Sequence, residues 1–203
     1  MIQTIFPTNI FIKDYELDED WNASLTAFLK AHFINSMTSS GNYAITSDET
    51  YGVFTKENLE SNKELRELRE MFVDGFYELS KSFNTNVESP LTREKILEGL
   101  GEKFGRLPFM KKGDVKRIHT HSDAEAFGIF YLNDINNEQD GGQLVLHDPS
   151  FNSLLFFREN RTLQIPTKKH RLIIVPSSVW HEVYQYLGEE ERITVVVNLR
   201  VSF

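Results

Sequence analysis

Two histidines stand one residue apart in the stretch VKRIHTHSDAEAFGIFYLND, residues 115–134. If this stretch is a strand, His119 and His121 point to the same side, because side chains i and i+2 share a face. Asp123 would share that face if the strand continued so far. A further imidazole, His181, follows in the short run SSVWHEVYQ. Imidazoles that converge from two strands suit Fe, Zn, Cu or Ni, and a carboxylate among them favours oxygen-activating iron.

A second group of residues could bind a carboxylate. Arg192 lies eleven residues after His181, and Thr194 follows on the same face of a predicted strand. A guanidinium can bind a carboxylate with two parallel hydrogen bonds, and a hydroxyl can add a third. Tyr131 could aim its hydroxyl at the same ligand or pack as a core residue. The alternative for Arg192 is a structural ion pair with a carboxylate of residues 189–191.

The other candidate groups indicate less. We expect His32, His147 and His170 to be structural or exposed, and Trp180 to pack in the core beside His181. The chain has no cysteine, which excludes disulfides, thiolate metal sites and cysteine nucleophiles. Its net charge of −8 argues against nucleic acid as a partner. Two basic stretches, 111–117 and 168–171, are either solvated loops or a rim that steers an anionic substrate.

The first half of the chain is predicted to be helical. Apolar residues recur at helical spacing within 17–35, and a second apolar stripe runs from Leu65 to Phe83. Ser61 and Glu64 form a capping-box pattern before that stripe. A shorter helix is expected after Pro90, and the polar stretch 35–50 is expected to be a loop.

Short apolar runs replace the helical pattern from about residue 105. Turn residues separate these runs at intervals of 8–14 residues, which is typical of an antiparallel sandwich or barrel. Helices followed by strands predict an α+β fold with the helices on one face of a sheet. We expect one domain over 1–203, with a mainly helical part at 1–104 and a strand core with the metal site at 105–203.

The sequence carries no sign of export or of membrane insertion. Its first residues lack a basic start and a small-residue cleavage site, and no run of about 18 apolar residues exists. We therefore expect a cytoplasmic protein with no membrane partner. The sequence leaves a homodimer open.

The ordered set of these residues resembles the 2-oxoglutarate/Fe(II)-dependent oxygenase superfamily, prolyl hydroxylases included. That superfamily has H-x-D/E, a YLN strand, a GG turn, a distal histidine, and an arginine followed by serine or threonine. The matching positions here are Tyr131-Leu132-Asn133, Gly141-Gly142, His181, and Arg192 with Thr194. The H-x-H, the strand at 128–132, the turn at Asp148-Pro149 and the start TIFPTNIFIKDYEL are similar to a family of small oxygenases from viral and bacterial genomes.

The resemblance implies a fold and a reaction. The fold would be a double-stranded β-helix, or jelly roll. Fe(II) would be held by histidines, 2-oxoglutarate by Arg192, Thr194 and Tyr131, and O2 would bind at the metal. Decarboxylation of 2-oxoglutarate to succinate would drive hydroxylation of a substrate that the sequence does not identify, whether a peptide side chain, an amino acid or a small metabolite. No catalytic residue beyond the metal ligands is expected.

Two registers of the metal site stay open. Related hydroxylases carry a glycine six residues before the first ligand, and Gly113 counts to His119. His121 then takes the place of the usual carboxylate, giving His119, His121 and His181. The other register uses His121 and Asp123 as H-x-D, together with His181. A third histidine in place of the carboxylate would change the charge on the metal.

Two alternative functions also stay open. One is a cupin-like, three-histidine metalloenzyme that does not use 2-oxoglutarate. The other is a jelly-roll module without catalytic activity, whose histidines have no role in its function.

Overall fold

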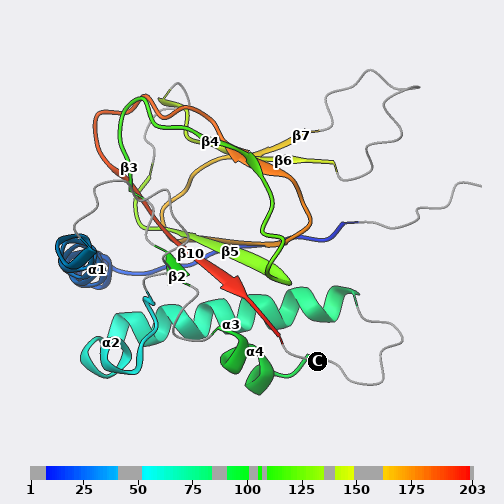
Figure 1. The fold of residues 1–203 in the computed structure, drawn as a ribbon, viewed down its shortest axis with the longest axis horizontal. Coiled ribbons are helices and arrows are strands. Elements are labelled where there is room, and N and C mark those ends of the chain that lie inside the picture. Colours follow the sequence, from blue (N-terminus) through cyan, green and yellow to red (C-terminus); the bar gives the residue numbers. More distant parts are fainter. Residues whose placement is uncertain are drawn as a thin grey trace, which may run out of the picture.

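A computed structural model describes residues 8–40, 52–83, 91–100, 105–106, 109–134, 140–148 and 162–201. Two antiparallel sheets lie one above the other, and helices cover the far side of the larger one (Figure 1). The helices are α1 (Glu19–Ser40), α2 (Lys56–Ser61), α3 (Lys63–Phe83) and α4 (Arg93–Gly99). The strands are β1 (Phe11–Asp14), β2 (Gly105–Arg106), β3 (Phe109–Met110), β4 (Lys116–His119), β5 (Ala126–Tyr131), β6 (Leu144–His147), β7 (Thr162–Ile165), β8 (Arg171–Pro176), β9 (His181–Val183) and β10 (Arg192–Leu199).

The larger sheet has the order β1-β8-β5-β10-β2, with β3 also paired to β10, and the smaller has the order β4-β9-β6-β7. Successive side chains of the central strands point to opposite faces of the larger sheet, so that an apolar core forms on each side of it. On β5, Phe127, Ile129 and Tyr131 face the smaller sheet, whereas Ala126 and Phe130 belong to the core on the helical side. Every residue of β5 is buried, which explains its unbroken apolar run. The space between the two sheets is therefore lined by alternate residues of β5 and β10.

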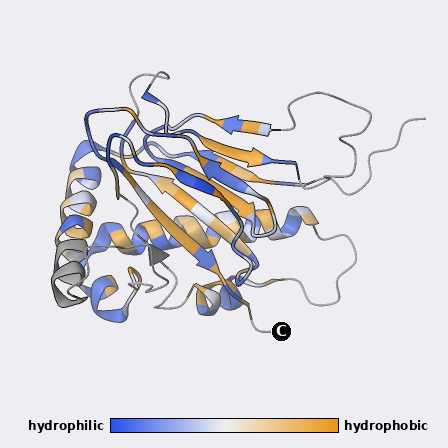
Figure 2. Ribbon diagram, turned by 45° about the horizontal axis from the view of Figure 1, so that its top comes forward, coloured by the Kyte–Doolittle hydropathy of each residue, from blue (hydrophilic) through white to orange (hydrophobic). Residues whose placement is uncertain are grey.

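Helix α3 lies across the outer face of the larger sheet (Figure 1). Its buried stripe follows the i, i+3, i+4 spacing expected of an amphipathic helix, and hydropathy colouring shows this alternation along α3 and the apolar strands above it (Figure 2). Gly75 lets the helix approach β8, because a Cβ there would lie 2.5 Å from Ile174 Cδ1. The helical half thus fixes the sheet that carries the site residues.

The predicted α+β arrangement, with helices on one face of antiparallel strands, is confirmed. Several boundaries were wrong. Helix α1 continues to Ser40, into the stretch expected to be a loop. The capping box is also wrong: Asn62 Oδ1 accepts from Leu65 N at 2.7 Å, while Ser61 Oγ donates to Asn58 O. Strand β1 was not expected, and it extends the sheet by pairing with β8. Residues 153–160, one of the short apolar runs from which strands were expected, lie outside the described residues, as does Pro149.

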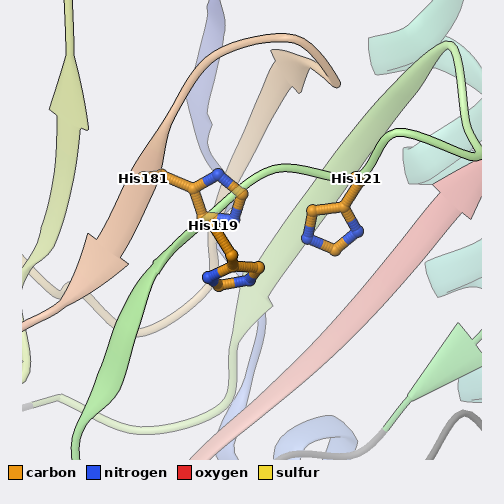
Figure 3. A group of neighbouring side chains, drawn as sticks. All are labelled: His119, His121 and His181. Carbon is orange, nitrogen blue, oxygen red and sulfur yellow. The ribbon is translucent and has the colours of Figure 1, made fainter.

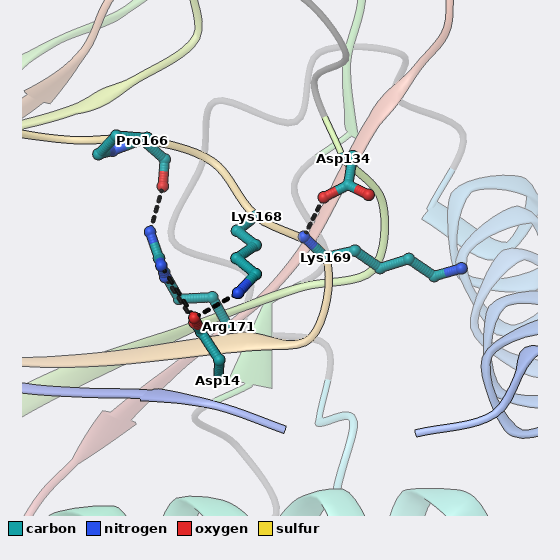
Figure 4. A network of polar contacts seen from close by, with 6 residues as sticks. All are labelled: Asp14, Asp134, Pro166, Lys168, Lys169 and Arg171. Carbon is teal, nitrogen blue, oxygen red and sulfur yellow. Dashed lines mark hydrogen bonds and ion pairs between the residues drawn. The ribbon is translucent and has the colours of Figure 1, made fainter. Parts of the chain in front are cut away.

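The basic stretch 168–171 is held in ion pairs and hydrogen bonds (Figure 4). Asp14 Oδ1 accepts from Arg171 Nε at 2.7 Å, and Asp14 Oδ2 accepts from Lys168 Nζ at 2.7 Å. The Lys169 backbone N–H donates to Asp134 Oδ1 at 2.6 Å. Hydrogen bonds from Arg171, ahead of those from Lys168, lower the pKa of Asp14 to about 2. These charges join β1 to the loop before β8, an ion-pair role that neither sequence interpretation of this stretch included.

None of the helices in the described ranges is long and apolar enough to cross a membrane.

Candidate metal centre

Three histidines meet at one end of the smaller sheet (Figure 3). One ligand nitrogen from each of His119, His121 and His181 lies within 4.8 Å of the others. His119 ends β4 and is the cross-strand partner of His181, which begins β9. His121 lies beyond the strand, and its backbone N–H donates to Ser177 O at 3.1 Å. The expectation of two histidines on one continuous strand was therefore wrong, because β4 ends at His119. His121 lies just beyond it, at the start of a turn in which the Ala124 N–H donates to His121 O.

Hydrogen bonds orient two of the rings. His119 Nδ1 lies 2.7 Å from the carbonyl oxygen of Arg117, and His181 Nδ1 lies 3.0 Å from that of Val179. A carbonyl oxygen only accepts, so we assign the proton to Nδ1 in both rings. Their Nε2 atoms then keep a lone pair for a metal ion.

An apolar ring supports the cluster from the larger sheet. Phe127 is fully buried, and its ring centroid lies 4.2 Å from that of His181 and 4.5 Å from that of His121, nearly parallel to both. Burial first, and then the charges of the neighbouring histidines, lower the pKa of His181 to about 3 against the opposing effect of the Val179 hydrogen bond. His181 is therefore a neutral nitrogen donor at neutral pH.

Asp123 is placed differently from the histidines. Its carboxylate forms an ion pair with Arg200, and 57% of its side chain is exposed. It does not belong to the group of candidate ligands found among the described residues. Of the two registers, the structure gathers the donors of the three-histidine one.

Arg192, Thr194 and Tyr131 also lie together. Thr194 is the cross-strand partner of Tyr131, and both are buried. The guanidinium of Arg192 lies 5.1 Å from the Tyr131 ring centroid, and its Nη1 lies 3.4 Å from Met110 Sδ. No carboxylate among the described residues pairs with Arg192, so the alternative of an ion pair with residues 189–191 was wrong. Glu189 pairs instead with Lys112, and Glu191 with Lys30 and Lys111.

This group is short of hydrogen-bond partners. Arg192 Nε and the Tyr131 hydroxyl are buried, and neither has a partner in the described part of the chain. Burial raises the pKa of Tyr131, against the opposing charge of Arg192. A buried polar group without a partner costs roughly 1–3 kcal/mol, and a charged one costs more. An anionic ligand that reaches both groups would remove that cost.

The candidate carboxylate-binding group, made of Arg192, Thr194 and Tyr131, and the histidine cluster lie along the same face of the larger sheet. Tyr131 and Phe127 share one face of β5 and are four residues apart, which corresponds to about 13 Å along a strand. A small dicarboxylate held between them could reach both the guanidinium and a metal at the histidines.

The remaining sequence expectations have mixed outcomes. His147 contacts Glu182 Oε1 at 3.0 Å and His170 contacts Asn22 Oδ1 at 3.0 Å, and neither belongs to the cluster. The side chain of His32 lies outside the described residues. Trp180 is 49% exposed, so the expectation that it packs in the interior was wrong. Sequence reasoning missed Asn198, a buried amide on the same face as Arg192, which only the i, i+2 spacing along β10 could have indicated.

The sequence and the structure were compared with those of known proteins. Residues 107–198 match the sequence model of a family described as "Putative 2OG-Fe(II) oxygenase". None of the curated proteins matches the chain. The resemblance found in the sequence is thus confirmed for the strand-rich half.

Solved structures share the fold at low identity. A Pseudomonas putida prolyl-4-hydroxylase is 16% identical with a TM-score of 0.53, covering 96% of this chain and 89% of its own. A Trichoplax adhaerens prolyl hydroxylase in complex with a peptide fragment of hypoxia inducible factor is 18% identical with a TM-score of 0.56, covering 94% and 83%. HygX from Streptomyces hygroscopicus, with nickel and 2-oxoglutarate bound, is 10% identical with a TM-score of 0.52, covering 97% and 83%.

Proposed function

Because residues 107–198 match a family of 2OG-Fe(II) oxygenases, we propose that this chain is an Fe(II)- and 2-oxoglutarate-dependent dioxygenase that hydroxylates a substrate. The cofactors of that family are Fe(II), 2-oxoglutarate and O2. The observation that carries the proposal is the buried guanidinium of Arg192, which has no carboxylate partner among the described residues and lies between the same two sheets as three grouped histidines.

The donor set fits Fe(II). His119, His121 and His181 would hold the ion, because three imidazoles leave coordination positions open for an oxo acid and for O2. When bound, the iron, 2-oxoglutarate and O2 together supply the oxidant for C–H hydroxylation, with succinate and CO2 as co-products. Asp123 is not a ligand in this proposal, since Arg200 already neutralises its carboxylate.

Other residues would bind and enclose the cosubstrate. Arg192 and Thr194 would bind the distal carboxylate of 2-oxoglutarate, and the Tyr131 hydroxyl would donate to it. Phe127 and the apolar residues between the sheets would keep water away from the metal. The chain's own contribution is therefore to bind, orient and exclude water.

The two sheets would form the double-stranded β-helix expected from the sequence. Their antiparallel order and the core between them support that assignment. One core contains residues of both α3 and β10, which supports a single domain over 1–203. The substrate would be a peptide side chain, an amino acid or a small metabolite, and the peptide in the Trichoplax complex favours the first.

Succinate formation from 2-oxoglutarate under air, with Fe(II)-loaded protein, tests this function. We expect succinate from the wild-type chain, and at least tenfold less from Arg192→Ala and His119→Ala, because each removes a ligand contact. Arg69→Ala is the matched control, since Arg69 lies on α3, on the far side of the larger sheet from the histidines, and should leave the rate unchanged.

Two other results would favour the alternatives. Stoichiometric metal without succinate, and with the same affinity in Arg192→Ala, would favour the cupin-like metalloenzyme. Absence of stoichiometric metal in the folded protein would favour the non-catalytic module.

A further inference from the structure

Asn198 is a buried polar residue that the proposed reaction does not use. It is 4% exposed and follows Arg192, Thr194 and Val196 at alternate positions of β10, on the face turned toward the smaller sheet. Its Oδ1 atom is buried without a hydrogen-bond partner. The wall of β10 therefore has a polar group at each end, Arg192 at one and Asn198 at the other.

Asn198 stands at the metal end of that wall. Its cross-strand partner is Phe127, and side chains directly opposite one another in a sheet have Cβ atoms about 4.5–5.5 Å apart. The Phe127 ring in turn stacks on His121 and His181. One side chain thus separates the amide from the candidate metal ligands.

The position is costly for an amide. An amide oxygen that is buried without a hydrogen bond loses its hydration without compensation, and asparagine is a poor strand former. The three residues before Asn198, Val195, Val196 and Val197, are all β-branched and apolar, as is typical of a buried strand. An amide here is explained if a ligand supplies its missing hydrogen bonds.

We propose that Asn198 binds the metal-chelating end of the oxo acid, with its amide N–H donating to the carboxylate next to the keto group. The two ends of the amide interchange by a half-turn of the side chain, so a donor can face the ligand. Arg192 would bind the opposite carboxylate. This inference rests on the proposed function, and it gives each end of the cosubstrate its own polar contact.

Binding of two probes to Ni(II)-loaded protein separates the two ends. The probes are 2-oxoglutarate and pyruvate, which has the same oxo-acid head but lacks the distal carboxylate. Isothermal titration should show that Asn198→Ala and Asn198→Leu weaken both probes by about tenfold to a hundredfold, since hydrogen bonds to charged groups are of that strength. Asn198→Asp should weaken both further by charge repulsion. Arg192→Ala should weaken 2-oxoglutarate and leave pyruvate within about threefold.

Thermal unfolding of the ligand-free variants is the folding control. Asn198→Leu should unfold at the same temperature as the wild type or higher, because it removes an unpaired amide. Unchanged pyruvate affinity in folded Asn198→Ala and Asn198→Leu would overturn this inference alone. Wild-type protein that binds neither probe would overturn the proposed function itself.

Discussion

At the scale of single residues, type and spacing predicted much of the candidate site. His119, His181 and Arg192 stood out because imidazoles and guanidinium groups carry chemistry wherever they converge. The role of His121 depended on where β4 ends, and that of Asp123 on its ion pair with Arg200. Asn198 was missed because an asparagine in a strand signals nothing until its burial and lack of a partner are known.

The two registers of the metal site make opposite predictions for neighbouring residues. We expect His121→Ala to weaken Ni(II) binding at least tenfold, because it removes one of three donors. Asp123→Asn should stay within about threefold of the wild type, since it removes only an ion pair that is more than a third exposed. Isothermal titration with Ni(II) measures both. The reverse order of effects would establish the H-x-D register instead.

At the scale of elements, helices and strands were predicted better than their boundaries and pairings. Hydrophobic periodicity showed where α3 and β10 run. A helix buried on one face, such as α3, has apolar residues at helical spacing, whereas a strand buried on both faces, such as β10, contains an unbroken apolar run. It could not show that β4 pairs with β9, since the register His119 to His181 joins segments far apart in the chain. It also missed β1, whose four residues are mostly exposed.

The ion pairs of Asp14 give the β1–β8 pairing a pH dependence. The pKa of Asp14 is about 2 in the folded chain, below its ordinary value of 3.8. The unfolded state therefore binds more protons between these values, and the stabilisation is present above pH 3.8 and lost as pH falls toward 2.

Urea unfolding measures this effect. We expect Asp14→Asn to be less stable than the wild type at pH 7, and the difference to shrink steadily below pH 4. Glu57→Gln, on an exposed position of α2, is the control and should show no such convergence. A difference that stays constant from pH 7 to pH 2 would mean that Asp14 acts through packing alone.

At the scale of the whole molecule, the order of helices and strands predicted the class of fold. Helices followed by strands led to an α+β arrangement, and the structure places α3 on the face of the larger sheet opposite the histidines. The sequence could not show that the buried arginine and the histidine cluster line one space. The distance between Arg192 and the histidines depends on how the two sheets stack, and local sequence patterns do not determine that stacking.

The central claim is that the histidine cluster and Arg192 bind the same small molecule. The most direct test is the affinity of 2-oxoglutarate for the wild type and for Arg192→Ala, each with and without Ni(II), by isothermal titration. We predict tight binding only when both the metal and Arg192 are present, with a loss of at least tenfold when either is removed. Equal affinity of the wild type with and without metal, or of metal-loaded Arg192→Ala and wild type, would contradict the claim.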